Sequence, residues 1–189
     1  MNIYDYRKLF EFNLEGLDNV IENMILKLMI DSEDLWKLLK YNDFNALAND
    51  NLTMEEKKEL VEIKQPLKNS NKPFKLVPYM NGQVLGEETT EIRIYPYNTN
   101  FTNETYVTQS VSIEIITHYN NYLIKDGFRV ERIKSEIIRA LNNFNYDNAD
   151  GILGRFTFQG TNSRNAYYTD SYIGARMLLI GDIKWLMKY

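Results

Sequence analysis

The sequence predicts an α+β fold: a single, mainly antiparallel sheet of about four to five strands, a central helix on one face and extra N-terminal helices. Apolar and polar residues alternate in several segments between residues 92 and 183, as expected of strands with one buried face. Between two of these segments, apolar residues recur every three or four positions from Val130 to Phe144, which indicates a helix. Strands and helices alternate too little for a doubly wound nucleotide-binding fold.

Three helices are expected in the N-terminal segment, residues 1–63. Apolar residues recur at helical spacing from Leu14 to Leu28, and Ser32 is placed to cap a second helix. The motif Thr53-Met54-Glu55-Glu56 predicts a third helix that opens with a capping box, in which the first and last side chains bond the backbone of the first turn. We interpret the apolar faces of these helices as core packing.

Residues 64–91 are expected to form an extended crossing segment. Pro66, Pro73 and Pro78 disfavour a helix there, and Asn81-Gly82 is a turn signal. The sheet body then occupies residues 92–189, and we expect the three segments to form one compact domain.

The sheet body is expected to contain strands at 92–96, 106–119, 156–158 and 175–183. Polar loops are expected at 98–104 and 159–170, and Asp126 is a candidate cap for the central helix.

The composition of the chain excludes several kinds of site and disfavours several kinds of partner. The chain has 189 residues, no cysteine and a net charge of -4. Without cysteine there are no disulfides, thiolate metal sites or thiol nucleophiles, and the acidic balance argues against broad affinity for nucleic acid or anionic membranes. The N-terminus lacks a secretory signal and the longest apolar run, Met24 to Ile30, is too short to span a bilayer. We therefore expect a protein of the cytoplasm with no membrane partner.

No motif predicts catalysis. His118 is the only histidine and has no neighbouring nucleophile or orienting partner. The segment 147–151 has alanine where a calcium loop needs an oxygen ligand, and 151–154 lacks the lysine and third glycine of a phosphate-binding loop. We expect no enzyme activity, no cofactor and no metal.

Basic residues are concentrated on the central helix. Arg129 and Arg132 lie one turn apart and are expected to share a face. Together with Arg139 they leave open a nucleic-acid-binding module, although the interspersed Glu131 and Glu136 favour a mixed-charge surface. A metal-dependent hydrolase with an unrecognised acidic site is a further alternative.

A resemblance to a known family is carried by a series of short segments: MILKL at 24–28, LWKLLKY at 35–41, KPFKLVP at 72–78, IRIYP at 92–96, SVSIEII at 110–116, GFRVERI at 127–133, EI at 136–137 and GILGRF at 151–156. In this order the segments resemble the tail-terminator or neck subunits of tailed bacteriophages. The resemblance covers most of the chain as a layout of helices and strands.

The resemblance implies a structural virion protein of the head-to-tail joining region, assembled in the host cytoplasm. Such subunits associate head to tail into a closed ring, here expected to be a homohexamer. The ring would end tail assembly by binding the tail tube protein on one face and a head connector or adaptor protein on the other. DNA would be a partner only by passage through the lumen.

Two polar loops, 98–106 and 159–172, are expected to make the subunit contacts, because long loops in compact domains are often functional. Tyrosine and arginine are also enriched where interfaces concentrate their binding energy. The candidate contact residues, including two from the central helix, are Asn100, Phe101, Tyr106, Arg129, Arg132, Arg164, Tyr167, Tyr168 and Tyr172.

Overall fold

The computed structural model describes residues 18–62, 72–76, 88–101, 106–147, 152–159 and 164–185. Its strands are β1 (Val61–Glu62), β2 (Phe74–Lys75), β3 (Thr90–Phe101), β4 (Tyr106–His118), β5 (Leu123–Ile124), β6 (Gly127–Phe128), β7 (Phe144–Asp147), β8 (Ile152–Phe158), β9 (Arg164–Thr169) and β10 (Tyr172–Trp185). Its helices are α2 (Asp18–Asp31), α3 (Glu33–Lys40), α4 (Met54–Glu59) and α5 (Arg129–Leu141), with short 3₁₀ turns η1 (Ala46–Ala48) and η2 (Tyr119–Asn121).

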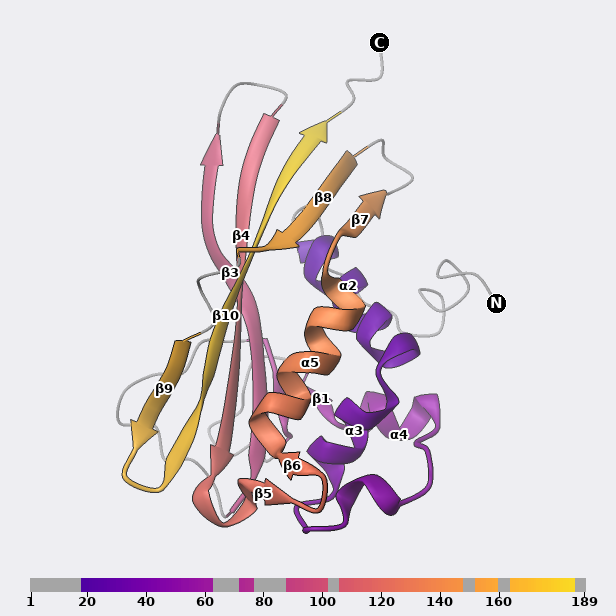
Figure 1. Cartoon of the computed structure of the whole chain (residues 1–189). Helices are drawn as coiled ribbons and strands as arrows, with labels where there is room; N and C mark the ends of the chain where they lie inside the picture. Colours follow the sequence, from indigo (N-terminus) through magenta and orange to yellow (C-terminus); the bar gives the residue numbers. More distant parts are fainter. Residues whose placement is uncertain are drawn as a thin grey trace.

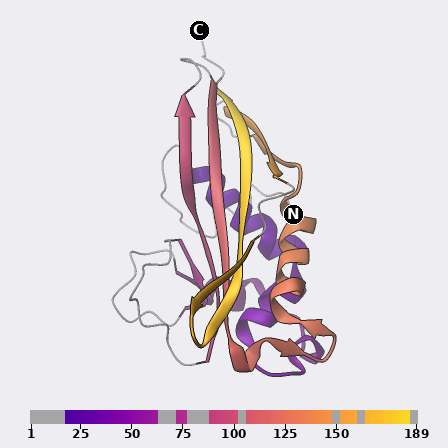
Figure 2. The same cartoon turned by 60° about the vertical axis from the view of Figure 1, so that its left-hand side comes forward.

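A large mixed sheet dominates the structure, and the helices lie on one side of it (Figures 1 and 2). The sheet has eight strands. Seven of them follow the order β1-β2-β3-β4-β10-β8-β7, and the eighth, β9, pairs with β10 outside this order. The β1–β2 and β2–β3 pairs are parallel, and the other pairs are antiparallel. Strands β5 and β6 form a separate two-stranded hairpin.

The predicted single sheet of four to five strands is therefore wrong. The strand β2 lies within the predicted crossing segment, and two residues are too few to show the alternation that marks a strand. The strand β9 occupies much of the predicted loop 159–170. It was not predicted as a strand because its sequence lacks alternating apolar residues. The first long strand continues past Pro96 to Phe101, through a register shift between Pro96 and Asn98.

Two of the predicted helix caps differ from the structure, and one is confirmed. Asp126 lies in the β5–β6 turn beside Gly127, whose φ of 129° suits glycine, and α5 begins after it at Arg129. Ser32 precedes α3 but makes no side-chain cap, and its hydroxyl donates instead to the backbone carbonyl of Glu136 at 3.3 Å.

The capping box of α4 forms as predicted. The Glu56 backbone N–H donates to Thr53 Oγ1 at 3.2 Å, and the Thr53 backbone N–H donates to Glu56 Oε2 at 2.9 Å. Other predicted features, namely Leu14, Pro66, Pro78 and Asn81-Gly82, fall outside the described residues.

The core lies between the sheet and helices α2, α3 and α5. Strands β3, β4 and β10 each send alternate apolar side chains into it, among them Ile94, Ile113 and Met177. Trp36 of α3 is fully buried and stacks on Phe74 of β2, with ring centroids 5.5 Å apart. This stacking anchors the short parallel strands to the helical layer.

Replacing Gly181 by alanine is expected to lower the free energy of unfolding by about 1–3 kcal/mol, as overpacking of a core does. A Cβ atom at Gly181 would lie 2.5 Å from Cδ1 of the fully buried Phe156 ring, so the ring or the backbone must shift. Urea unfolding followed by circular dichroism measures the change.

Gly154→Ala is the matched control on the paired strand. There the nearest atom to an added Cβ is Cγ1 of the Ile183 side chain, at 3.2 Å. The control should therefore cost less than Gly181→Ala. Equal losses for the two variants would contradict the packing argument.

Candidate functional site

Charged residues form one row across five strands of the sheet. The register aligns Glu62 with Lys75, Lys75 with Arg93, Arg93 with Glu114, and Glu114 with Arg176. Their chain neighbours on both sides include the buried apolar residues of the core, so the row lies on the face of the sheet away from the helices. We refer to these five residues as the charged row.

The first half of the charged row is organised by Glu91, two residues before Arg93 on the same face of β3. Glu91 Oε1 accepts a hydrogen bond from Lys75 Nζ at 2.7 Å. Glu91 Oε2 accepts from Arg93 Nη2 at 2.8 Å and from Arg93 Nε at 3.2 Å. All three side chains are buried, so these are ion pairs shielded from water.

The second half is organised by Glu114, which is fully buried on β4. Its Oε1 accepts from the Tyr95 hydroxyl at 2.9 Å and from Arg176 Nε at 2.8 Å, and Arg176 Nη2 donates to the same oxygen. Burial raises the pKa of the Tyr95 hydroxyl, and its hydrogen bond to Glu114 adds to that rise. Arg176 differs from the rest because about half of its side chain, 52%, is exposed.

Cations hold both Glu91 and Glu114, and the charged row together with Glu91 contains three carboxylates and three cations. Glu62 differs from the other two carboxylates, because its buried Oε2 atom has no hydrogen-bond partner. Carboxylates in such pairs are poor general bases and poor metal ligands. Within the described ranges, no group of three or more His, Cys, Asp or Glu side chains is arranged to hold a metal ion. The arrangement stiffens the outer face of the sheet and presents the Arg176 guanidinium at its surface.

The first group of predicted contact residues lies at one end of the sheet. Asn100 and Phe101 end β3, and Tyr106 begins β4. The Asn100 side chain is exposed. The expected loop between these strands is shorter than predicted, and residues 102–105 are outside the described part of the chain.

The second group lies at the other end. Arg164, Tyr167 and Tyr168 are on β9, and Tyr172 begins β10. Tyr172 is buried, and burial raises the pKa of its hydroxyl. Its ring lies edge-on to the ring of His118, with the centroids 5.0 Å apart.

The two groups are therefore separated by the length of the sheet. Strand β4 runs 13 residues from Tyr106, a member of the first group, to His118, which pairs with Tyr172 of the second. At the usual rise per residue this is roughly 40 Å. Figure 1 shows the β3–β4 end at the top of the molecule and the β9–β10 turn near the bottom.

Arg129 and Arg132 do not share a surface. Arg129 is fully buried, and burial lowers its guanidinium pKa to about 10. Its guanidinium donates to four backbone carbonyls: Nε to Asn121 at 2.7 Å, Nη1 to Leu38 at 2.6 Å and Tyr41 at 2.8 Å, and Nη2 to Asp43 at 2.8 Å. Arg129 therefore ties the start of α5 to the end of α3.

The other two arginines of α5, Arg132 and Arg139, are exposed but paired. Arg132 forms an ion pair with Asp34 at 2.5 Å and reaches Glu136 at 3.9 Å. Arg139 also pairs with Glu136 and donates to the Asp31 carbonyl at 3.0 Å. These contacts do not favour the nucleic-acid module, because each cation already faces an acidic group or a carbonyl.

The charged row was not identified in the sequence. A signal was present, since Glu91, Arg93 and Tyr95 alternate with apolar Ile92 and Ile94. Polar residues at every second position, however, also describe a solvated strand face. Only the register between strands shows that the charges meet.

Comparison with known protein families places most of the chain in one family. The model of the YomW family matches residues 32–179, which is more than half of the chain. No curated protein and no solved structure matches the sequence. Among the helices of the described residues, none is long and apolar enough to cross a membrane.

Proposed function

Because the chain belongs to the YomW family, a phage-associated family, we propose that it is a structural protein of a bacteriophage particle rather than an enzyme. The family match begins at α3 and ends within β10, so it covers most of the sheet. More specifically, we propose a tail-terminator-like ring subunit of the neck, which ends tail assembly and joins the tail to the head connector.

The observation that supports this role best is the position of the two candidate contact regions. They lie at opposite ends of a sheet strand roughly 40 Å long, as given by the rise per residue. A joining subunit must bind two different partners on opposite faces, and a long rigid sheet keeps two binding ends at a fixed distance. We assign one end to the tail tube protein and the other to the connector or adaptor protein.

The charged row supports the same role through rigidity. On the outer face an ion pair joins β2 to β3, the Tyr95–Glu114 hydrogen bond joins β3 to β4, and the Arg176–Glu114 ion pair joins β4 to β10. The apolar core holds the same strands together on the inner face. In the ring, copies would associate head to tail, because a heterologous contact that closes gives a ring. The net charge of -4 suits a lumen through which DNA passes without binding.

Deleting the gene from the phage or prophage is expected to give particles in which heads and tails fail to join, with tails of unregulated length. Electron microscopy of lysates measures both properties, and mass spectrometry of purified wild-type particles should detect the chain. A plasmid copy of the wild-type gene should restore joined particles. Joined particles with tails of normal length in the deletion strain would overturn the proposal.

Two variants, each expressed from the plasmid in the deletion strain, test the two ends of the sheet separately. Asn100→Lys places a charge at the exposed β3–β4 end, and Asp170→Lys reverses a charge at the exposed β9–β10 turn. Each variant is expected to block a different joint, so one should leave free tails with the protein attached and the other free heads with it attached. The same defect from both variants would contradict the assignment of one partner to each end.

A further inference from the structure

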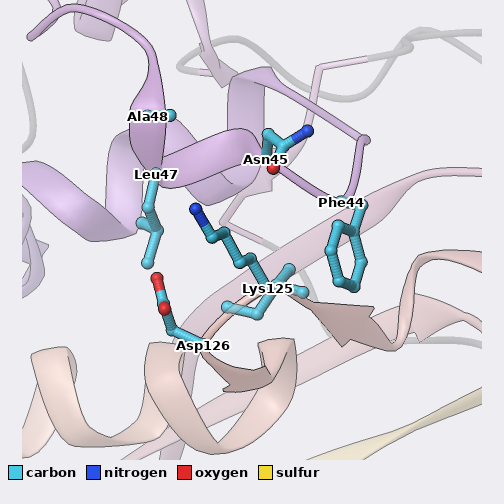
Figure 3. Close-up of a pocket in the computed structure, with 7 residues that line it drawn as sticks. Phe44, Asn45, Leu47, Ala48, Lys125 and Asp126 are labelled. Carbon is cyan, nitrogen blue, oxygen red and sulfur yellow. The ribbon is translucent and has the colours of Figure 1, made fainter.

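A hollow lies between the turn η1 and the β5–β6 hairpin (Figure 3). Its volume is about 150 Å³. The residues that line it are Phe44, Asn45, Leu47, Ala48, Ile124, Lys125 and Asp126. An apolar cavity of this volume holds one benzene ring in other proteins. The hollow therefore has the size of one aromatic side chain.

An exposed aromatic ring stands at the edge of this hollow. The Phe44 side chain is 57% exposed, although it is large and apolar. The backbone that carries this ring is held by hydrogen bonds: Lys125 N donates to the Phe44 carbonyl at 2.9 Å, Asn45 N donates to Asp43 Oδ1 at 2.7 Å, and Arg129 Nη2 donates to the Asp43 carbonyl at 2.8 Å. A partner that buries the ring therefore does not have to order the loop as well.

One cation and one anion face the same hollow. In Figure 3 the Lys125 side chain extends toward the space between Leu47 and Asn45, and the Asp126 carboxylate points into that space from below. In the described part of the chain nine other cations form ion pairs, but Lys125 and Asp126 form none, with each other or with other groups. Asp126 only adds to the electrostatic field at Arg132.

We propose that this surface binds a second copy of the same chain about a two-fold axis. In the pair, Phe44 of each copy enters the hollow of the other, and Lys125 of each copy faces Asp126 of the other. A two-fold contact uses the same patch on both copies, so it needs a surface that is complementary to itself. This surface carries the ring and its hollow, and the positive and the negative charge, side by side.

A second copy matches the hollow and both of its charges better than an acidic partner, a basic partner or a small apolar ligand. An acidic partner would leave Asp126 unmatched, a basic partner would leave Lys125 unmatched, and a small apolar ligand would leave both. The inference does not depend on the proposed virion role. The contact gives a dimer of the free chain and doubles its mass.

Sedimentation equilibrium of the full chain at about 100 µM, a range that detects small and transient interfaces, tests the proposal. The wild-type protein is expected to have twice the mass of Phe44→Ser. Lys125→Glu and Asp126→Lys each place like charges opposite one another and should weaken association more than tenfold. The double variant Lys125→Glu/Asp126→Lys exchanges the two charges and should restore the wild-type mass.

Tyr97→Ser is the matched control for Phe44→Ser, since Tyr97 is 59% exposed and lies on β3, away from the hollow. It should keep the wild-type mass, and circular dichroism confirms that each variant is folded. The proposal is overturned if wild type and Phe44→Ser have equal masses, if Tyr97→Ser lowers the mass as much, or if the charge exchange fails to restore it. None of these results bears on particle morphology, so the virion role is judged separately.

Discussion

Arg129→Met is expected to lower the free energy of unfolding by about 3–5 kcal/mol, because several carbonyls lose a charged donor at once and each buried acceptor left unsatisfied costs about 1–3 kcal/mol. The Arg129 guanidinium is fully buried and donates to four backbone carbonyls. Methionine fills similar space but donates no hydrogen bond, so buried carbonyls at the end of α3 and in η2 lose their donor. Urea unfolding followed by circular dichroism measures the loss.

Two comparisons make the test specific. Arg129→Lys keeps the charge but replaces a planar fork of donors with one ammonium, so it should recover only part of the loss. Arg132→Met removes an arginine one turn along the same helix whose side chain is 47% exposed, and it should cost less than about 1 kcal/mol, as exposed ion pairs do. Similar losses for Arg129→Met and Arg132→Met would contradict the anchoring role of Arg129.

Arg129 also shows a limit of helical periodicity. The sequence places Arg129 and Arg132 one turn apart, and this spacing predicted a shared basic surface. In the structure Arg129 is the first residue of α5, where the chain leaves the β5–β6 hairpin and runs beside the end of α3. Its burial depends on carbonyls from Leu38 to Asp43, which are far away in the sequence, and no local pattern identifies them.

The same limit explains which strands could be predicted. Alternating isoleucines marked β3 and β4, because each strand is long and buries one face. The strands β1, β2 and β9 are short or polar, and they exist because the neighbouring strand offers backbone partners. These three strands form only when the sheet assembles, so the number of strands predicted from the sequence was too low.

The charged row, like the short strands, depends on pairing between strands that are far apart in the sequence. Glu114 was visible as a single acidic residue in an apolar strand, and Arg176 as one of several scattered basic residues. The antiparallel pairing of β4 with β10 sets Glu114 opposite Arg176, and the pairing with β3 sets it opposite Arg93. A shift of one residue in either pairing would turn the charges into the core. The charged row therefore helps to define the register as well as the stiffness of the sheet.

Glu91→Gln is the second substitution expected to have a large effect, about 3–5 kcal/mol of unfolding free energy, because it leaves two buried cations without their carboxylate. Lys75 and Arg93 both donate to Glu91, and none of the three side chains is more than 7% exposed. The amide has nearly the same shape, so the loss reports charge rather than packing. Urea unfolding at low and at about 0.5 M salt should give the same loss, because salt screens buried pairs weakly.

Glu131→Gln is the control, since it makes the same chemical change in a residue of α5 whose side chain is 51% exposed. Glu131 forms an ion pair with Lys134 at 3.0 Å, so its loss should be small and should shrink as salt is added. A buried pair and an exposed pair thus differ in two readouts, the size of the loss and its response to salt. If Glu91→Gln behaves like Glu131→Gln in both, water reaches the charged row, and the row cannot set the register of the sheet.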